Sequence, residues 1–185
     1  FVEVGYSRTT TTLIAEKARL SRGAMLHHFP SKLAIVRAAV EYLHAKRLRA
    51  FRKAVSNPSP DGDHVRQSVE AYWAHVHHPM FVAFFELAVA ARTDKELAAV
   101  LRPAQEAFER EWYQVAVDLF PEWKGAGENF ELAFDLARYL LEGMAISFLT
   151  YGENKRAERV LRYLEAKLKE LAGLPAPNKS TGKKK

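Results

Sequence analysis

The residues whose types and spacing could do chemistry lie in one stretch, residues 5–32, with the sequence GYSRTTTTLIAEKARLSRGAMLHHFPSK. Arg22 stands at the expected first turn of a short helix. An arginine there can donate two hydrogen bonds to O6 and N7 of a guanine. Gly23 and Ala24 add little bulk, so the backbone beside Arg22 can approach the edges of bases closely.

Two further groups of residues suit phosphates rather than bases. His27, His28 and Lys32 follow at the end of the same helix, where the strand backbones of a bound duplex would lie. Thr9 and Thr10 begin an earlier helix, and a helix N-terminus is a favourable place to hold a phosphate. The stretch therefore indicates hydrogen bonding to nucleic acid, with base readout from one turn and backbone contacts around it.

Short helices must position these side chains. Residues 9–18 form the first, with a run of threonines that suits an N-cap, and a break follows. Ser21 can cap a second helix over residues 22–29, which Pro30 ends, and Ser31 can cap a long third one. Two short helices across a tight turn form a helix-turn-helix, whose second helix enters the major groove. A pair of capped helices that never touches DNA would give the same pattern.

The spacing also carries a resemblance. The run G-Y-x-x-T-T-x-x-x-I-A-E-x-A-x-x-S-R-G-A-x-x-H-H-F-P-S-K resembles the DNA-binding signature of the tetracycline-repressor (TetR) family, closely over about residues 1–50. The resemblance implies a DNA-binding transcriptional regulator. The positions where the family contacts the DNA backbone are Thr9, Thr10, Leu26, His27, His28 and Lys32. The positions where it meets bases or a flanking phosphate are Ser21, Arg22, Gly23 and Ala24.

Two residues depart from the family pattern. Arg19 stands in the turn where the family usually has glycine, and a non-glycine residue in the left-handed region costs about 1–2 kcal/mol. Leu26 replaces a tyrosine that contacts phosphate, which removes one hydroxyl donor. In addition, Phe1 to Val4 look like the last turn of the family's first helix, so we expect residues upstream of Phe1. Without them, Leu13, Ile14, Met25 and Phe29 would be partly uncovered.

Charge separates the chain into parts. Residues 1–56 hold 11 Lys and Arg against 3 Asp and Glu, whereas residues 57–172 hold 13 against 19. A basic amino-terminal third beside an acidic remainder favours a polyanion partner for the first part. The chain has no cysteine and no apolar run long enough for a membrane span, so we expect a cytoplasmic protein that contacts no membrane.

The remaining pattern predicts an all-α body. A long helix from Ser31 to about Val55 joins the DNA-binding head to it, with these basic residues expected outside: Lys46, Arg47, Arg49, Arg52 and Lys53. Further helices are expected over residues 63–77, 80–92, 94–119 with a kink or restart at Pro103, 128–151, and 154–172. Asp94 is expected to cap the third of these, and glycines to end the last two.

We therefore predict three parts: a helix-turn-helix DNA-binding domain over residues 1–50 with a truncated first helix, a helical-bundle ligand-binding and dimerisation domain over 51–173, and a disordered basic tail over 174–185. A loop is expected at 57–62, where Pro, Ser, Asp and Gly gather.

The body suits two kinds of contact. Residues 128–151 are apolar nearly all round, so a second copy of the chain could cover one side. The resemblance likewise implies a homodimer through the last two long helices, facing a two-fold operator. The candidate dimer residues are Phe148, Leu161, Leu164 and Leu168. An aromatic-rich bundle can also form a mostly apolar pocket, and the resemblance implies a small-molecule inducer. Its candidate lining residues are Trp73, Phe85, Trp112, Phe134 and Met144.

Enzymatic function finds little support. The chain has no nucleophile elbow, no phosphate-binding glycine-rich loop and no His-Glu-x-x-His motif. Glu41 and His44 form a single Glu-x-x-His pair, and His75 with His78 could reach one metal, but no further ligand joins either pair. We expect no catalytic site, no metal site and no cofactor. The prediction is a repressor released from its operator by a small, mostly apolar molecule. Two alternatives stay open: a DNA-binding regulator without a small-molecule switch, and a helical enzyme or carrier on the same scaffold.

Overall fold

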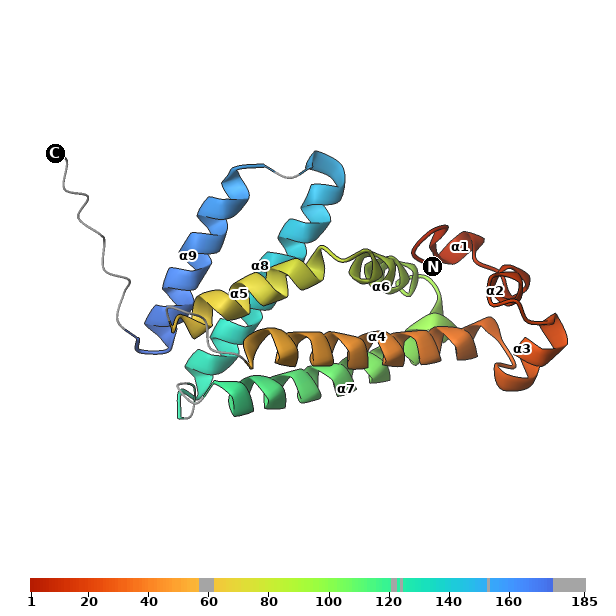
Figure 1. The fold of residues 1–185 in the computed structure, drawn as a ribbon, viewed down its shortest axis with the longest axis horizontal. Helices are drawn as coiled ribbons and strands as arrows, with labels where there is room; N and C mark the ends of the chain where they lie inside the picture. The colour runs from red at the N-terminus through yellow and green to blue at the C-terminus, as the bar shows by residue number, and fades with distance from the viewer. Residues whose placement is uncertain (57–61, 121–122, 124, 153, 175–185) are drawn as a thin grey trace. The chain divides into compact units, whose positions relative to one another are not determined.

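The computed structural model describes residues 1–56, 62–120, 123, 125–152 and 154–174, and all regular structure in those ranges is helical. This confirms the predicted all-α fold. Nine helices occur there (Figure 1): α1 (Gly5–Arg8), α2 (Thr11–Lys17), α3 (Arg22–His28), α4 (Lys32–Val55), α5 (His64–Val76), α6 (Pro79–Ala90), α7 (Lys95–Leu119), α8 (Glu128–Tyr151) and α9 (Arg156–Leu171). Most of the predicted loop at 57–62 and most of the predicted tail fall outside the described residues.

Side chains at the helix ends explain where several helices begin. The Oγ atoms of Ser21 and Ser31 accept hydrogen bonds from the backbone N–H groups of Ala24 and Ala34, each at 3.1 Å. A carboxylate oxygen of Asp94 accepts from the N–H of Leu97 at 2.9 Å. These three caps confirm the predicted ones. The predicted restart at Pro103 does not occur, because α7 continues through it from Lys95 to Leu119, whereas a kink there stays a prediction.

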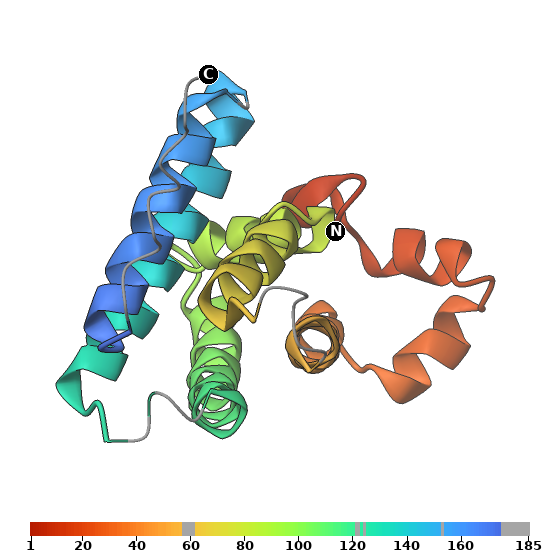
Figure 2. The ribbon, with the colours of Figure 1, turned by 60° about the vertical axis from the view of Figure 1, so that its left-hand side comes forward.

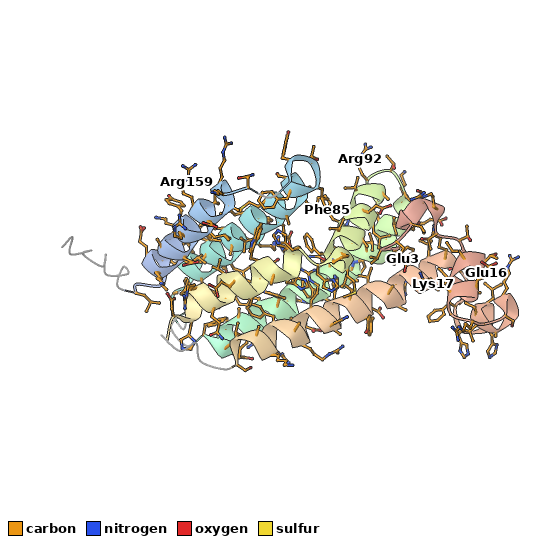
Figure 3. All side chains as sticks on the ribbon, turned by 45° about the horizontal axis from the view of Figure 1, so that its top comes forward. Glu3, Glu16, Lys17, Phe85, Arg92 and Arg159 are labelled. Carbon is orange, nitrogen blue, oxygen red and sulfur yellow. The ribbon has the colours of Figure 1, made fainter. Side chains whose placement is uncertain are left out.

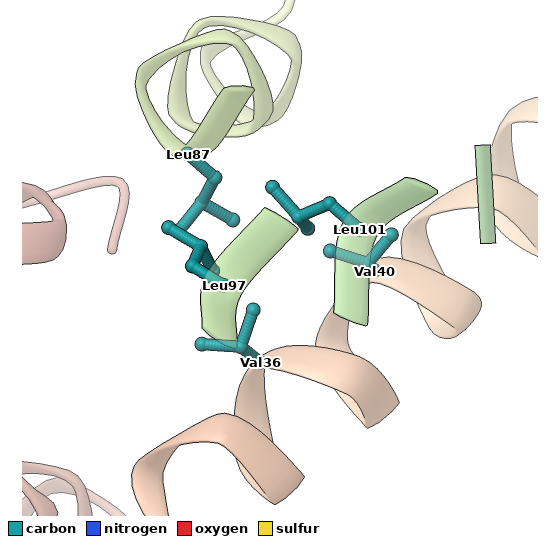
Figure 4. Close-up of a cluster of buried hydrophobic side chains, with 5 residues drawn as sticks. All are labelled: Val36, Val40, Leu87, Leu97 and Leu101. Carbon is teal, nitrogen blue, oxygen red and sulfur yellow. The ribbon is translucent and has the colours of Figure 1, made fainter. Parts of the chain in front are cut away.

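The chain forms two compact units, residues 1–53 with 74–115 and residues 54–73 with 116–185. These units do not test the predicted domain boundary at residue 50, which stays a prediction. In the first unit, α4 and α7 run side by side (Figure 1), and α6 packs against α1. Its core contains the cluster of Figure 4, whose members are Val36, Val40, Leu87, Leu97 and Leu101. Phe1 and Tyr6 pack against that cluster, so the first residues of the chain belong to this core.

In the second unit, α8 and α9 lie side by side (Figure 2). Among the apolar residues of α9, Leu164 is fully buried and Leu168 is nearly so. The hydroxyl of Tyr72 in α5 donates to a carboxylate oxygen of Glu142 in α8 at 2.8 Å. An ion pair between Lys169 and Asp63 joins α9 to the residue before α5. No described helix combines the length and the apolarity that crossing a membrane requires.

Candidate nucleic-acid interface

The turn between α2 and α3 is fixed by short-range hydrogen bonds. Thr10 caps α2, because its Oγ1 accepts from the N–H of Leu13 at 3.1 Å. After α2, the N–H of Leu20 donates to the carbonyl of Ala15 at 2.9 Å. Arg19 has a φ of +57°, so it occupies the left-handed position in which the family pattern has glycine. The turn is therefore not shifted, and the chain tolerates the strain of about 1–2 kcal/mol.

The leading turn of α3 faces solvent. Arg22, Gly23 and Ala24 are exposed, whereas Met25 on the opposite side is buried. A Cβ added at Gly23 would meet only the Oγ of Ser21, at 3.9 Å, which is ordinary van der Waals contact. The fold itself does not require a glycine at this position. A surface that must approach another molecule closely gives a reason for it.

The other candidate contact residues fall into two groups. His27 and His28 are exposed at the end of α3, with their ring centroids 5.4 Å apart. Thr9 is buried, and its hydroxyl donates to the carbonyl of Gly5 at 2.6 Å. The ammonium of Lys32 donates to the carbonyl of Tyr6 at 2.6 Å and lies 4.0 Å from the centroid of the Tyr6 ring.

Burial of Lys32 against Tyr6 lowers the pKa of its ammonium group. Leu26 is half-buried, and Ser21 and Thr10 are exposed although each uses its side-chain oxygen as a helix cap. Thr9 and Lys32 thus hold the head together, whereas the leading turn of α3 and the two histidines offer free surface. Which of them contact DNA stays a prediction.

A carboxylate that the sequence pattern did not predict fastens α1 to α6. An oxygen of Glu86 accepts a hydrogen bond from the N–H of Tyr6 at 2.7 Å. Gly5 has a φ of +76°, and a Cβ built on it would lie 2.7 Å from the same oxygen. Glu3 and Lys17 form an ion pair within the same unit (Figure 3). The available signal was that Glu86 is the single charged residue of the apolar helix Pro79–Ala90.

The middle of α4 holds buried polar groups, one of which the sequence pattern placed outside. The prediction that Arg47 lies outside is wrong, because this residue is only 2% exposed. Its guanidinium carbon lies 4.4 Å from the ring centroid of Phe108 and 5.5 Å from that of Phe81. Its Nε–H donates to Nε2 of His75 at 2.6 Å. The planar guanidinium stacks on aromatic faces, which explains how a charged group is accommodated there.

The histidines beside Arg47 are held neutral. Burial, followed by the charge of Arg47, lowers the pKa of His75 to about 3, with a smaller contribution from His78. The same two causes lower the pKa of His44 to about 4, against a hydrogen bond with the backbone of Ala104 that acts in the opposite direction. Within the described residues, no group of three or more His, Asp or Glu side chains could hold a metal ion.

The candidate pocket residues lie in both units. Phe85 and Trp112 belong to the first unit, where the ring of Trp112 packs 4.6 Å from that of Phe51. Trp73, Phe134 and Met144 belong to the second unit and are half-buried. Their lining of one common pocket stays a prediction.

The candidate dimer residues differ in exposure. Leu164 and Leu168 are buried, whereas Phe148 and Leu161 are half-buried, and the ring of Phe148 lies edge-on to Trp73 at 5.7 Å. Exposed apolar side chains occur elsewhere on the two helices: Leu132, Tyr139, Leu149 and Tyr151 on α8, and Tyr163 on α9. The role of the four candidates in a dimer stays a prediction.

Residues 1–39 match the model of the family described as bacterial regulatory proteins, tetR family. The HTH-type transcriptional regulator CymR of Pseudomonas putida is 27% identical over 162 residues, which cover 85% of this chain and 78% of that protein. The HTH-type transcriptional regulators Mb2936c of Mycobacterium bovis and Rv2912c of Mycobacterium tuberculosis are each 25% identical over 150 residues, covering 78% of this chain and 74% of theirs. No solved structure matches the chain significantly.

The match covers α1, α2, α3 and the first turns of α4, which are the elements that position the exposed turn at Arg22. The chain is a DNA-binding transcriptional regulator, and its residues 1–39 match the TetR family.

Proposed function

We propose that this regulator is a homodimeric, sequence-specific repressor, released from double-stranded operator DNA by a small, mostly apolar molecule. The exposed leading turn of α3 is the observation that carries the DNA-binding part. Arg22 is free to reach into a groove, and its neighbours Gly23 and Ala24 keep the backbone close to the base edges. An arginine in this place reads guanine through O6 and N7.

The contact between α1 and α6 supports a switch. The head is tied to α6 by a charged hydrogen bond from Tyr6 to Glu86 and by apolar packing of Phe1 and Tyr6 on the core cluster. A displacement of α6 would therefore act on the head directly. A ligand that binds more tightly when α6 is displaced shifts the population away from the DNA-binding arrangement, by as much as its two affinities differ.

The exposed apolar side chains of α8 and α9 support a homodimer. Leu149 is 60% exposed and Tyr163 is 70% exposed, and Leu132 and Tyr139 are comparable. Large exposed apolar groups on paired helices favour a protein interface. Two copies related by a two-fold axis also present two recognition helices to successive major grooves, which a single helix-turn-helix cannot do.

Operator selection from randomised duplexes, followed by binding to Arg22→Ala, tests the proposal. The substitution is expected to weaken binding by about 1–3 kcal/mol and to relax the preference at one base pair in each half-site. Arg92→Ala is the matched control, because Arg92 is an exposed arginine of the same unit outside the helix-turn-helix.

The same titration gives the stoichiometry, for which we expect two chains per operator. A variant lacking Arg22 that keeps the full base preference would remove this residue from the readout. One chain per operator would contradict the dimer. An apolar effector is then sought by its ability to lower the affinity for the selected operator.

A further inference from the structure

A groove along the paired helices α4 and α7 lies apart from the candidate DNA-contact, pocket and dimer residues. Its volume is about 380 Å³, and none of the five candidate pocket residues lines it. The polar residues at the groove are Arg37, Glu41 and His44 from α4 and Glu111 from α7, and apolar residues of α7 supply much of its wall. All of them belong to the first unit, so the groove does not depend on how the two units are arranged.

His44 places an unused hydrogen-bond acceptor at this groove. The side chain is 5% exposed, and its ring stacks on that of Phe108 with centroids 4.3 Å apart. Its Nε2 has no hydrogen-bond partner among the described residues. A neutral imidazole has one donor and one acceptor, and the backbone of Ala104 occupies one side of the ring. Nε2 is then the acceptor, and a partner for it must supply a donor.

Pro103 adds a second acceptor. It lies inside α7 and lines the groove, and proline has no N–H to donate to the carbonyl four residues before it. That carbonyl belongs to Ala99, which also lines the groove. The helix therefore leaves the Ala99 carbonyl without its regular intrahelical donor.

The charged side chains give the groove its sign. Glu41 and Glu111 come from opposite helices and are both exposed, and Arg37 is the one cationic residue of the lining. Arg37, Glu41 and Glu111 form no ion pair with a described residue. Two carboxylates, one carbonyl and one imidazole nitrogen accept hydrogen bonds, against a single guanidinium that donates. A ligand with an ammonium group and an apolar body matches this excess of acceptors over apolar walls.

We propose that the groove between α4 and α7 binds a small organic cation, with its ammonium group held by Glu41 and Glu111 and its apolar body against Phe108 and the walls of α7. His44 and the carbonyl of Ala99 are additional acceptors for the N–H groups. This site goes beyond the proposed function, because it makes no claim about release of DNA.

Three probes that share an aromatic ring on a short chain test the charge preference: 2-phenylethylammonium, 2-phenylethanol and phenylacetate. Isothermal titration calorimetry of the full chain at neutral pH is expected to show the ammonium binding most tightly, the alcohol more weakly and the carboxylate not at all. The combined variant Glu41→Gln and Glu111→Gln is expected to weaken binding of the ammonium about tenfold or more, because hydrogen bonds to charged groups are the stronger ones. The separate variant His44→Phe keeps an aromatic ring but removes the imidazole acceptor, and it is also expected to weaken binding of the ammonium.

The combined variant Glu96→Gln and Glu106→Gln is the control. It removes the same charge from α7 at exposed positions that do not line the groove. It is expected to bind 2-phenylethylammonium as the unchanged chain does. The proposal is overturned if the three probes bind equally, if none of them binds, or if both combined variants weaken binding to the same extent. These experiments do not measure operator affinity. The proposed function can therefore be contradicted while this site is supported, and this site can be contradicted while the proposed function is supported.

Discussion

The leading turn of α3 and the middle of α4 belong to the same compact unit, yet they handle charge in opposite ways. At α3, Arg22 and two histidines lie in solvent, and caps within three residues hold the backbone. In α4, Arg47 is buried between aromatic rings supplied by residues 34 and 61 positions further along the chain. Local sequence therefore determines where a helix begins, whereas distant residues determine whether a charged side chain on that helix is exposed.

Substituting Arg47 tests the buried side of this comparison and has the largest expected effect. Arg47→Ala removes a side chain packed on Phe108 and Phe81 and leaves a cavity, so the free energy of unfolding is expected to fall by about 2–4 kcal/mol. Arg49→Ala is the control at an exposed position of the same helix, with an expected change within about 0.5 kcal/mol. Urea unfolding measures both. Equal losses would mean that burial of Arg47 contributes nothing.

Glu86→Ala tests the contact that ties the head to α6. The N–H of Tyr6 loses a charged acceptor, so we expect a loss of about 1–3 kcal/mol and faster hydrogen exchange at that amide. Glu86→Gln keeps a side-chain oxygen that can accept, and it is expected to retain most of the protection. If the alanine and glutamine variants exchange alike, the hydrogen bond does not hold α1.

The buried histidines make the stability of the folded chain depend on pH. The pKa values of His44 and His75 in the folded protein, about 4 and about 3, lie below their ordinary value of 6.5. As the pH falls below about 6.5, the unfolded chain takes up protons at these residues and the folded chain does not. Stability is therefore expected to decrease between about pH 6.5 and pH 4, by at most about 1.4 kcal/mol per pH unit for each histidine.

Unfolding curves at several pH values measure that slope. His44→Phe and His75→Phe are each expected to flatten it, whatever they do to stability at neutral pH. A slope that both variants leave unchanged would assign the pH dependence to other groups.

Arg19 tests the local side of the comparison and has the smallest expected effect. Arg19→Gly relieves the left-handed backbone at φ +57° and is expected to stabilise the head by about 0.5–1 kcal/mol after the extra entropy of the unfolded glycine is subtracted. Arg19→Ala removes the same side chain and keeps the strain, so thermal unfolding of the two variants isolates the backbone term. A glycine variant no more stable than the alanine variant would show that the turn relaxes in solution.

The sequence predicted what depends on neighbours within a turn or two. The caps at Ser21, Ser31 and Asp94 were correct, because each involves an N–H three residues away. Helix ends agree within about two residues for most elements, and the family assignment came from the same local stretch. The predicted exposure of Arg47 was wrong, because the rings of Phe81 and Phe108, which lie far along the chain, cover it.

The groove between α4 and α7 was beyond sequence reasoning for the same physical reason. Its two walls are about 60 residues apart in sequence, and no motif marks the pairing of Glu41 with Glu111. His44 was noticed only as part of a Glu-x-x-His pair, and its burial against Phe108 could not be read from that spacing. Glu86 carried a readable signal, a lone charge in an apolar helix, but its partner at Tyr6 could not be inferred.

Gly5 imposes two independent demands on any mutant at its position. D-Alanine at position 5 would adopt the φ of +76° without strain. Its methyl group would point in a different direction from the L-alanine methyl group, which collides with Glu86. An ordinary alanine meets both obstacles, and shortening Glu86 removes only the collision. In a pairwise mutational scan, we therefore expect loss of the carboxylate at position 86 to rescue substitutions at position 5 only in part. Compared with the Glu86 variant alone, the cost that remains would measure the strain of the positive φ at position 5.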